Sequence, residues 1–384
     1  MQKIKVGIIG TGFIGSVHID ALRRLGFVEV AAIADIDEEI ARQKAEQYHI
    51  PKYYSNYHDL LKDSSIQCVH VCTPNHLHFE ICKEALLLNK HVVCEKPLAV
   101  TVKQAEELVS LAGDRNLVNA VHFNLRFYPL IQHAREVIMN GEIGDIIAVN
   151  GSYQQDWLLL QTDYSWRLEK QYSGESRAVA DIGSHWCDMI EYITGLRIKQ
   201  VCSDFATFYP TRKKPLKAIE TYSGREQDDQ AFEDVCINTE DYASVLLRFD
   251  NGAHGSLTVN QMAAGRKNRL FFEIYGTKKS ISWDSEKPNE MWTGKRDGSN
   301  EILIKDPKLL HQSAREITGL PGGHNEGFYD TSKQMFRKVY NQIMHQMKDK
   351  KAEEDFPTFE SGYRELLICS GIVRSWKEER WTNV

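Results

Sequence analysis

The sequence predicts an α/β protein of two domains: an N-terminal domain with a parallel sheet covered by helices, and a C-terminal α+β domain with a mostly antiparallel, open sheet. The chain has 384 residues, and single cores usually split beyond ~250–300 residues. In the first third, short apolar runs alternate with helical patterns, whereas strands dominate the later part. We therefore place the domains at residues 1–123 and 124–384.

In the N-terminal domain, the expected strands are continuous apolar runs, which is typical of parallel strands buried on both faces. The helical segments repeat apolar residues three and four positions apart. Thr101 and Gln104 have the spacing of a helix-capping box. The expected strands are 4–9, 28–34, 67–73, 91–95 and 118–123, and the expected helices are 14–25, 38–48, 76–88 and one opened by Thr101.

In the C-terminal domain, the pattern changes to strands with one apolar face. Residues facing one side of 242–249 are apolar and alternate with residues facing the other side. Asn251-Gly252 is a strong hairpin signal. Residues 181–194 are expected to form a helix that ends before Gly195. The other expected helices are 130–139, 328–346 and 361–376, and the other expected strands are 146–153, 256–261, 270–275 and 280–283.

Composition excludes several classes of protein. The net charge is −6, so nucleic acid is not an expected partner. The basic run Arg212-Lys213-Lys214 with Lys217 is expected to be a solvated surface loop. Apolar runs are far shorter than the ~20 residues that span a bilayer, and several cysteines lie in apolar runs, as in a reducing compartment. We therefore expect a soluble, cytoplasmic protein without membrane contact.

Residues 10–15, Gly-Thr-Gly-Phe-Ile-Gly, fit the G-x-G-x-x-G spacing. The motif follows a strand and opens a helix, which is the context that the dinucleotide-binding (Rossmann) fingerprint requires. Gly10 permits the tight turn, Gly12 lets the backbone approach a pyrophosphate, and Gly15 lets helix and strand pack closely. The helix start, with Phe13 and Ile14, offers N–H groups to the anion.

Asp35 directly follows the second expected strand, twenty positions after Gly15. Its carboxylate can accept hydrogen bonds from both ribose hydroxyls of the adenosine, whereas a 2′-phosphate would be repelled. Asp37 adds to the repulsion, and Arg42 lies too far along the next helix to offset it. We therefore expect NAD rather than NADP as the cofactor.

Three further motifs follow: Thr73-Pro74-Asn75 with His78 one turn on, Glu95-Lys96-Pro97, and Asp181-x-Gly183-x-His185. With the fingerprint, they resemble the Gfo/Idh/MocA family of oxidoreductases, the glucose–fructose oxidoreductase and inositol dehydrogenase group. The segment 123–129, Trp166-Arg167 and the late segment 357–360 are also similar to that family. The resemblance covers essentially the whole chain and implies a cis Lys96–Pro97 bond.

The residue types fit alcohol oxidation, which needs a hydride acceptor, a proton acceptor and a group that stabilises negative charge on oxygen. NAD supplies the first, His185 suits the second, and Lys96 can donate to the reacting oxygen. Asp181, four residues before His185, can hold substrate or orient the imidazole. The resemblance implies the same trio, and the sequence leaves open whether Lys96 or His185 takes the proton.

Other candidate site residues rest on the resemblance or on residue type alone. The strand-end residues Thr73, Pro74, Asn75, His78, Glu95 and Lys96 are expected at the cofactor, as are Asn124, Trp166 and Arg167 by the resemblance. Trp157 suits stacking on a sugar ring, and Arg167 and His324 are further candidate substrate contacts. Cys68, His70 and Cys72 alternate along one segment, but a buried strand explains them more simply than a metal site, and we expect no metal.

The leading hypothesis is an NAD-dependent dehydrogenase or reductase that acts on an unphosphorylated sugar, anhydrosugar or inositol. One alternative is a glycosidase of the same fold that retains its NAD, and another is a dinucleotide-binding regulator without turnover. We expect a homodimer or homotetramer, because an exposed antiparallel sheet face favours association.

Overall fold

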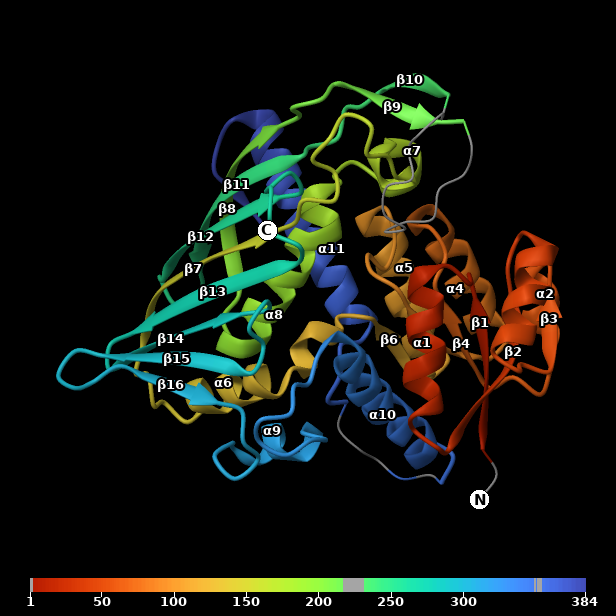
Figure 1. Cartoon of the computed structure of the whole chain (residues 1–384), viewed down its shortest axis with the longest axis horizontal. Helices are drawn as coiled ribbons and strands as arrows, with labels where there is room; N and C mark the ends of the chain where they lie inside the picture. The colour runs from red at the N-terminus through yellow and green to blue at the C-terminus, as the bar shows by residue number, and fades with distance from the viewer. Residues whose placement is uncertain (1–2, 217–230, 349, 351–353) are drawn as a thin grey trace. The chain divides into compact units, whose positions relative to one another are not determined.

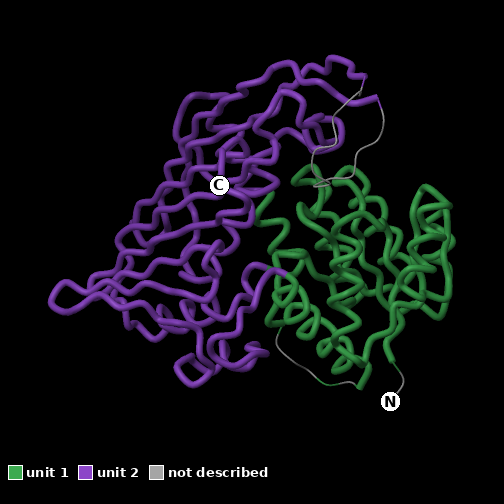
Figure 2. Tube along the Cα trace, viewed as in Figure 1, with its two compact units in different colours: residues 1–124, 329–366 green, residues 125–328, 367–384 purple. Residues whose placement is uncertain are grey.

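The computed structural model describes residues 3–216, 231–348, 350 and 354–384. Lys217 of the basic run lies outside the described residues. Two compact units are present (Figure 2): residues 1–124 with 329–366, and residues 125–328 with 367–384.

The first unit contains a six-stranded parallel sheet, confirming the predicted Rossmann domain (Figure 1). Its strand order is β3-β2-β1-β4-β5-β6, so the order reverses between β1 and β4. In such sheets, ligands bind at the carboxyl ends of the strands beside this reversal. The strands are β1 (Ile4–Ile9), β2 (Val28–Ala34), β3 (Lys52–Tyr54), β4 (Cys68–Val71), β5 (His91–Cys94) and β6 (Asn119–Val121), and the helices are α1 (Phe13–Arg23), α2 (Glu38–Gln47), α3 (Tyr57–Lys62), α4 (His78–Leu87) and α5 (Val102–Asp114).

Two helices near the chain end also contribute to the first unit. These are α10 (Phe328–Gln346) and the beginning of α11 (Phe359–Glu378). The ring of Phe336 in α10 lies 4.8 Å from the ring of His18 in α1, and Phe359 of α11 is buried in the core of this unit. Residues 329–366 therefore belong to the same compact unit as residues 1–124.

The second unit contains a nine-stranded sheet in the order β16-β15-β14-β13-β7-β12-β11-β8-β17. All neighbouring strands are antiparallel except β7 and β12, so the sheet is mostly antiparallel, as predicted. The strands are β7 (Ile146–Gln154), β8 (Ile198–Ala206), β11 (Tyr242–Phe249), β12 (His254–Asn260), β13 (Arg269–Gly276), β14 (Lys279–Asp284), β15 (Glu290–Lys295), β16 (Glu301–Ile304) and β17 (Thr382–Asn383).

Helices cover one face of this sheet. They include α6 (Pro129–Met139) and α8 (Ser184–Thr194), whose buried residues share one core with the sheet. Trp186 of α8 donates from Nε1 to the carbonyl oxygen of Phe271, 3.0 Å away, and a Cβ at Gly151 of β7 would lie 2.3 Å from the same Nε1. The α8 helix therefore lies directly on the sheet. The remaining elements are α7 (Lys170–Ser173), α9 (Gln312–Ile317) and the pair β9 (Thr211–Pro215) and β10 (Phe232–Cys236).

The expected hairpin at Asn251-Gly252 joins β11 to β12, and Gly252 adopts a positive φ of 88°. Along β11, alternate residues are buried, as the sequence pattern predicts, while Leu246 is 53% exposed.

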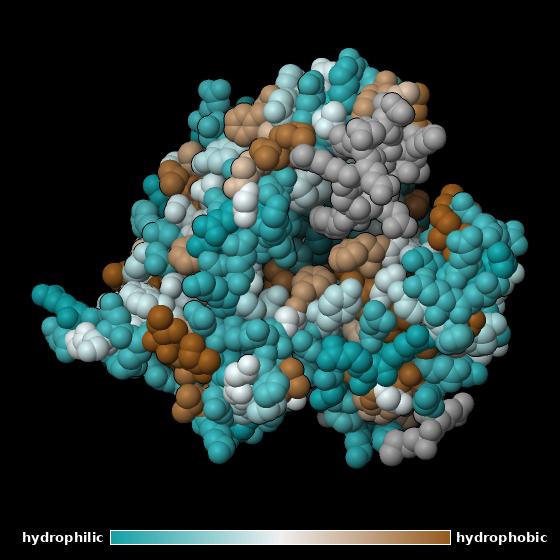
Figure 3. Space-filling view, viewed as in Figure 1, coloured by the Kyte–Doolittle hydropathy of each residue, from teal (hydrophilic) through white to brown (hydrophobic). Residues whose placement is uncertain are grey.

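On the face drawn in Figure 3, hydrophilic residues predominate and apolar side chains form small separate groups. Among the described residues, no helix has both the length and the apolar character that crossing a membrane demands.

Candidate active site

The glycine-rich loop joins β1 to α1. Gly10 has a φ of 91°, and a Cβ there would lie 2.7 Å from the carbonyl oxygen of Cys72. A Cβ at Gly15 would lie 2.2 Å from the carbonyl oxygen of Gly10, whereas a Cβ at Gly12 would meet nothing within 4 Å. Gly10 and Gly15 are therefore required by packing within the protein, and Gly12 leaves open space beside the backbone.

The beginning of α1 fits a dinucleotide pyrophosphate. Gly12 is the N-cap residue and offers no side chain to the helix, and the first turn holds no acidic residue. The first N–H groups of a helix carry a partial positive charge and readily bind a phosphate oxygen. Phe13 and Ile14 are the first two residues of this helix, and Phe13 is 52% exposed.

Asp35 follows β2 and is tied to the same loop. Its Oδ2 accepts from the backbone N–H of Thr11 at 2.9 Å and from the Thr11 hydroxyl at 2.6 Å. Asp37 caps α2 by accepting from the N–H groups of Glu39 and Ile40. A carboxylate has about four acceptor positions, so Asp35 retains capacity for ribose hydroxyls.

Two candidate loops follow the ends of neighbouring strands, and one of them lies beside the glycine loop. Thr73-Pro74-Asn75 follow β4 and Glu95-Lys96 follow β5, and these strands are hydrogen-bonded neighbours. A Cβ at Gly10 would lie 3.0 Å from the backbone nitrogen of Thr73, which shows how closely the loops meet. The Lys96–Pro97 peptide bond is cis, as the resemblance implies.

His78 connects these two loops. Its ring is fully buried, with Nδ1 2.7 Å from the carbonyl oxygen of Pro97 and Nε2 2.8 Å from that of Thr73. Burial lowers the pKa of His78, and a neutral imidazole donates to one carbonyl at a time. We expected His78 at the cofactor. Its side chain lies between the Thr73 and Pro97 loops, and a contact of His78 with the cofactor stays a prediction.

Glu95 faces a buried group of histidines that the sequence reasoning did not find. Its Oε1 lies 3.0 Å from Nε2 of His18 and 2.5 Å from Nδ1 of His122, while its Oε2 lies 3.3 Å from the backbone N–H of Lys96. Burial alone raises the pKa of Glu95, but the charge and hydrogen bonds of His122 and His18 outweigh it and hold the pKa well below the ordinary value. Glu95 is therefore an ionised acceptor directly before Lys96.

The histidine network continues away from Glu95 in both directions. The hydroxyl of Tyr340 lies 2.7 Å from Nε2 of His70, and Nδ1 of His70 lies 2.8 Å from Nδ1 of His18. On the other side, Nε2 of His122 lies 3.0 Å from the hydroxyl of Ser332.

One proton assignment satisfies the contacts that lead from Tyr340 and Ser332 to Glu95. Tyr340 donates to His70, His70 to His18, and His18 to Glu95, while Ser332 donates to His122 and His122 to Glu95. His18 and His70 are then neutral, which agrees with burial lowering the pKa of His18 to about 4 and that of His70 well below 6.5. The network fixes the Glu95 carboxylate.

Asn124 follows β6 and is also buried. Its side-chain nitrogen donates to the hydroxyl of Thr331 at 2.8 Å and to that of Ser332 at 3.3 Å. These contacts anchor the end of the Rossmann domain to α10. Contact between Asn124 and nicotinamide stays a prediction.

In the second unit, Asp181 and His185 lie at the beginning of one helix, but the first turn is not α-helical. Val179–Gly183 form a π-helical turn, and α8 begins at Ser184. We expected Asp181 and His185 on one face of a regular helix. A π turn is wider than an α turn because its hydrogen bonds span five residues, and such turns occur frequently at functional sites.

The N–H groups that open this helix are held by Glu240. Its carboxylate accepts from the backbone N–H groups of Arg177 and Val179, at 3.0 and 2.9 Å through Oε1, and from the Ser176 hydroxyl at 2.6 Å. A carboxylate at a helix N-terminus is favourable because of the helix dipole. The backbone before Asp181 is therefore fixed from outside the helix.

The described contacts of the Asp181 carboxylate include two side chains. Its Oδ2 accepts from the amide nitrogen of Gln261 at 2.9 Å, and its Oδ1 lies 3.5 Å from Nε of Arg167. The Arg167 guanidinium also lies over the Trp166 ring, 4.4 Å from its centroid. The structure thus brings Trp166, Arg167 and Asp181 together. Gln261 was not predicted, since nothing in its local sequence distinguishes it from other glutamines.

His185 has an aromatic neighbour that the sequence did not reveal. The Tyr153 ring of β7 lies 6.3 Å from the His185 ring, and the Tyr153 hydroxyl donates to Oδ1 of Asn268 at 2.9 Å. Trp157 connects to the same group: its Nε1 donates to Gln155, whose amide nitrogen donates to Asn268 at 2.8 Å. Trp157 and Tyr153 are therefore parts of one hydrogen-bonded network.

His324 lies on an exposed loop: its backbone N–H donates to the carbonyl oxygen of Pro321, 3.3 Å away, and its own carbonyl oxygen accepts from the Lys305 ammonium at 2.9 Å. The loop is anchored by the buried ion pair of Lys305 and Glu326, at 2.6 Å. A contact of His324 with substrate stays a prediction.

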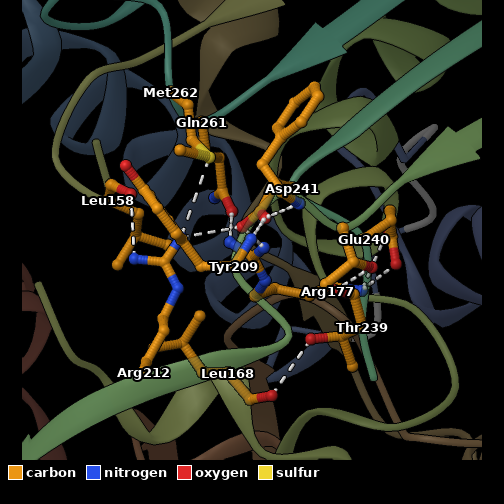
Figure 4. A network of polar contacts seen from close by, with 12 residues as sticks. Leu158, Leu168, Arg177, Tyr209, Arg212, Thr239, Glu240, Asp241, Gln261 and Met262 are labelled. Atoms are coloured by element: carbon orange, nitrogen blue, oxygen red, sulfur yellow. Dashed lines mark hydrogen bonds and ion pairs between the residues drawn. The ribbon is translucent and has the colours of Figure 1, made fainter. Parts of the chain in front are cut away.

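Arg212 overturns the prediction of a solvated surface loop. Its side chain is fully buried, because Nη2 forms an ion pair with Asp241 at 2.9 Å and Nη1 donates to the carbonyl oxygens of Leu158 and Leu160. Arg177, also fully buried, pairs with the same Asp241 oxygen. Figure 4 shows the two guanidinium groups converging on Asp241, with Gln261 beside them.

Comparisons with known proteins agree with this architecture. Residues 4–123 match a family described as an oxidoreductase family with an NAD-binding Rossmann fold, and residues 131–282 match the GFO/IDH/MocA C-terminal domain. Levoglucosan dehydrogenase from Pseudarthrobacter phenanthrenivorans is 30% identical, over 100% of this chain and 99% of that protein. Myo-inositol 2-dehydrogenase from Thermotoga maritima is 26% identical over 73% of this chain and 75% of its own length.

A solved structure of levoglucosan dehydrogenase in complex with NADH and levoglucosan superposes with a TM-score of 0.87 and 29% identity, covering 100% of both chains. The N-terminal match includes the glycine loop and the Glu95-Lys96-Pro97 motif, and the C-terminal match includes Asp181 and His185. The chain therefore belongs to the Gfo/Idh/MocA family of oxidoreductases, and its first unit is an NAD-binding Rossmann domain.

Proposed function

We propose that this protein is an NAD-dependent dehydrogenase that transfers a hydride between nicotinamide and a hydroxyl-bearing carbon of a sugar, anhydrosugar or inositol. One observation carries the proposal: Asp181 is held between Gln261 and Arg167 at the beginning of the His185 helix, in a chain similar over its whole length to levoglucosan dehydrogenase. A fixed carboxylate suits a substrate rich in hydroxyl groups.

The proposed roles follow from the chemistry of the side chains. When bound, NAD supplies the hydride acceptor. The Lys96 ammonium donates to the reacting oxygen and stabilises its negative charge. His185 takes the hydroxyl proton as general base, and Asp181 accepts a hydrogen bond from a substrate hydroxyl or from the His185 imidazole. Arg167 and Trp166 are proposed near the nicotinamide, and Trp157 and His324 at the sugar.

We propose NAD rather than NADP as the cofactor. Asp35 stands where the ribose hydroxyls of the adenosine bind in Rossmann domains. The nearby Arg42 is already paired with Glu39 at 2.7 Å and Glu46 at 2.6 Å. Its positive charge is thereby largely neutralised, so a 2′-phosphate would face Asp35 and Asp37 with little compensation.

A panel of unphosphorylated sugars, anhydrosugars and inositols, incubated with NAD and followed by NADH absorbance, tests this function. We expect NADH to accumulate with at least one compound, levoglucosan and myo-inositol being the first to try because of the similar proteins. Cleavage of a glycoside without NADH accumulation would favour the NAD-retaining glycosidase instead. NAD binding without any turnover would favour the regulator.

We also propose a cytoplasmic homodimer or homotetramer. Six of the eight cysteines are buried as free thiols, which suits a reducing compartment. Strand residues Leu246, Ile302 and Ile304 are 53%, 61% and 51% exposed and offer apolar surface for a second copy. Light scattering should give two or four times the 44.1 kDa mass of one chain. A single-chain mass would contradict the assembly.

A further inference from the structure

Gln261 joins Asp181 to a buried cluster of charged side chains. It directly follows β12 and is fully buried. Its amide nitrogen lies 2.9 Å from Oδ2 of Asp181, and its amide oxygen lies 2.6 Å from Nη1 of Arg177. One side chain therefore spans the distance between the candidate site and the cluster in Figure 4.

The orientation of this amide follows from donor chemistry. The oxygen and nitrogen of a glutamine side chain are hard to distinguish by shape alone. Arg177 can only donate hydrogen bonds, so the glutamine atom that faces it must be the carbonyl oxygen. The atom that faces Asp181 is then the NH₂ group, which can only donate. Oδ2 of Asp181 must accept, so this oxygen carries no proton.

Arg177 is itself held so that it cannot turn away from Gln261. Its Nη2 forms an ion pair with Oδ1 of Asp241, which also pairs with Arg212, and its backbone N–H donates to Glu240. The other Asp241 oxygen accepts from the N–H of Phe208 at 2.7 Å. Two guanidinium groups and two carboxylates thus balance in charge, and the whole cluster is buried, which makes each contact costly to break.

Two arginines act in the same direction on the Asp181 carboxylate. Arg167 approaches Oδ1 at 3.5 Å, and Arg177 acts on Oδ2 through Gln261. His185 follows on the same helix, with Tyr153 beside it. The carboxylates of Glu240 and Asp241 are occupied by backbone N–H groups and by the two buried arginines.

We propose that Gln261 is a positioning residue that keeps Asp181 permanently as an ionised hydrogen-bond acceptor. Asp181 then fixes a substrate hydroxyl or the His185 imidazole and does not exchange a proton during turnover, which leaves the proton to His185 or Lys96. This inference rests on the proposed function, because it assigns a role within that reaction.

Two substitutions at this position test the inference. Gln261→Glu places a second carboxyl group against Asp181. Two carboxylates so close share a proton, so the acid limb of the kcat/KM profile should move to higher pH by about one unit or more. Gln261→Leu removes the donor and should lower kcat by ~10-fold, the cost of about one lost hydrogen bond to a charged group.

The matched control is Gln132→Leu. Gln132 is another buried glutamine of the same unit that is bonded on both sides, to the carbonyl oxygen of Arg126 at 2.7 Å and to the Tyr192 hydroxyl at 2.9 Å. Its loss should lower the melting temperature as Gln261→Leu does, yet leave the pH profile unchanged. A merely structural role for Gln261 predicts the same behaviour for both leucine variants.

The outcomes separate the two proposals. If the wild type oxidises a sugar and Gln261→Glu has an unshifted acid limb, the role of Gln261 is wrong and the proposed function stands. If no compound of the panel is oxidised, the proposed function fails. The role of Gln261 is then read from NMR titration of isotope-labelled aspartate, assigned with Asp181→Asn. A higher pKa of Asp181 in Gln261→Glu supports it, and an equal pKa overturns it.

Discussion

Thr11 and Asp35 are joined by two hydrogen bonds to one carboxylate oxygen, from the Thr11 backbone N–H at 2.9 Å and from its hydroxyl at 2.6 Å. These bonds connect the glycine loop, which follows β1, to the residue that follows β2. The same carboxylate that orders the loop is proposed to select the cofactor.

Asp35→Ser should lower kcat/KM for NAD and should reduce the preference for NAD over NADP. Loss of hydrogen bonds to a charged group costs about 1.5–3 kcal/mol, so kcat/KM for NAD should fall by roughly 10- to 100-fold. Asp37→Asn is the control for NAD alone: asparagine caps a helix about as well as aspartate, so α2 should stay intact and kcat/KM for NAD should stay close to the wild-type value. Steady-state kinetics with both cofactors check this, and an unchanged NAD/NADP ratio in Asp35→Ser would contradict it.

Gly12→Ala and Gly15→Ala should impair different properties: the first NAD affinity, the second thermal stability. A Cβ at Gly12 meets no protein atom within 4 Å, so the fold should tolerate alanine while NAD affinity falls, because the Cβ occupies space near the pyrophosphate. A Cβ at Gly15 would lie 2.2 Å from the carbonyl oxygen of Gly10, so this variant should melt at lower temperature. Calorimetry of NAD binding and thermal melting measure the two effects. Equal affinity in Gly12→Ala and wild type would refute the proposed cradle.

The protein should lose stability as the pH falls from about 6.5 toward 4. Burial lowers the pKa of His91 and of His133 to about 4, and the Nδ1 atom of each accepts a backbone N–H, from Val118 and His311 respectively, both at 3.1 Å. The unfolded chain takes up these protons near pH 6.5 while the folded chain does not. Stability contributed by the neutral rings is therefore present above pH 6.5 and is lost on acidification.

Melting temperatures across this pH range measure the effect. His133→Asn keeps an acceptor for the His311 N–H but does not titrate, so it should melt with a shallower dependence on pH than the wild type. Identical slopes for the two proteins would show that His133 is not held neutral.

Substitutions of Lys96 and His185 should have non-additive effects on turnover, because both side chains are proposed to act in the same chemical step. His185→Gln should lower kcat by ~10²–10⁴-fold, the usual contribution of a general base. Residues that act as a unit give non-additive losses, so the double variant Lys96→Ala/His185→Gln should be little worse than the more damaging single variant. Losses in kcat/KM that multiply would mean that the two side chains act independently.

The features that could be predicted are those that depend on short local sequence patterns. The strand–glycine loop–helix around Gly10, the acidic end of β2 at Asp35 and the β11–β12 hairpin are each specified within a few residues. A period of apolar residues or a glycine requirement is visible at that scale, and these features are present as predicted.

What could not be predicted depends on distant parts of the chain meeting. His18, His122 and Tyr340 form one network only because α10 packs on the Rossmann domain. Arg212 was predicted to be exposed because its ion-pair partner, Asp241, is distant in the sequence. The π turn at Asp181 could not be predicted either, because apolar spacing does not distinguish it from the start of an α-helix.

The most direct measurement compares turnover and cofactor binding in Lys96→Ala. At saturating NAD and with a sugar that the wild type oxidises, NADH formation should fall by ~10³-fold, the scale at which loss of one group that stabilises an oxyanion acts. The Kd for NAD, measured by calorimetry, should stay close to the wild-type value. Turnover within tenfold of the wild type, with intact NAD binding, would contradict the assignment of the reacting centre.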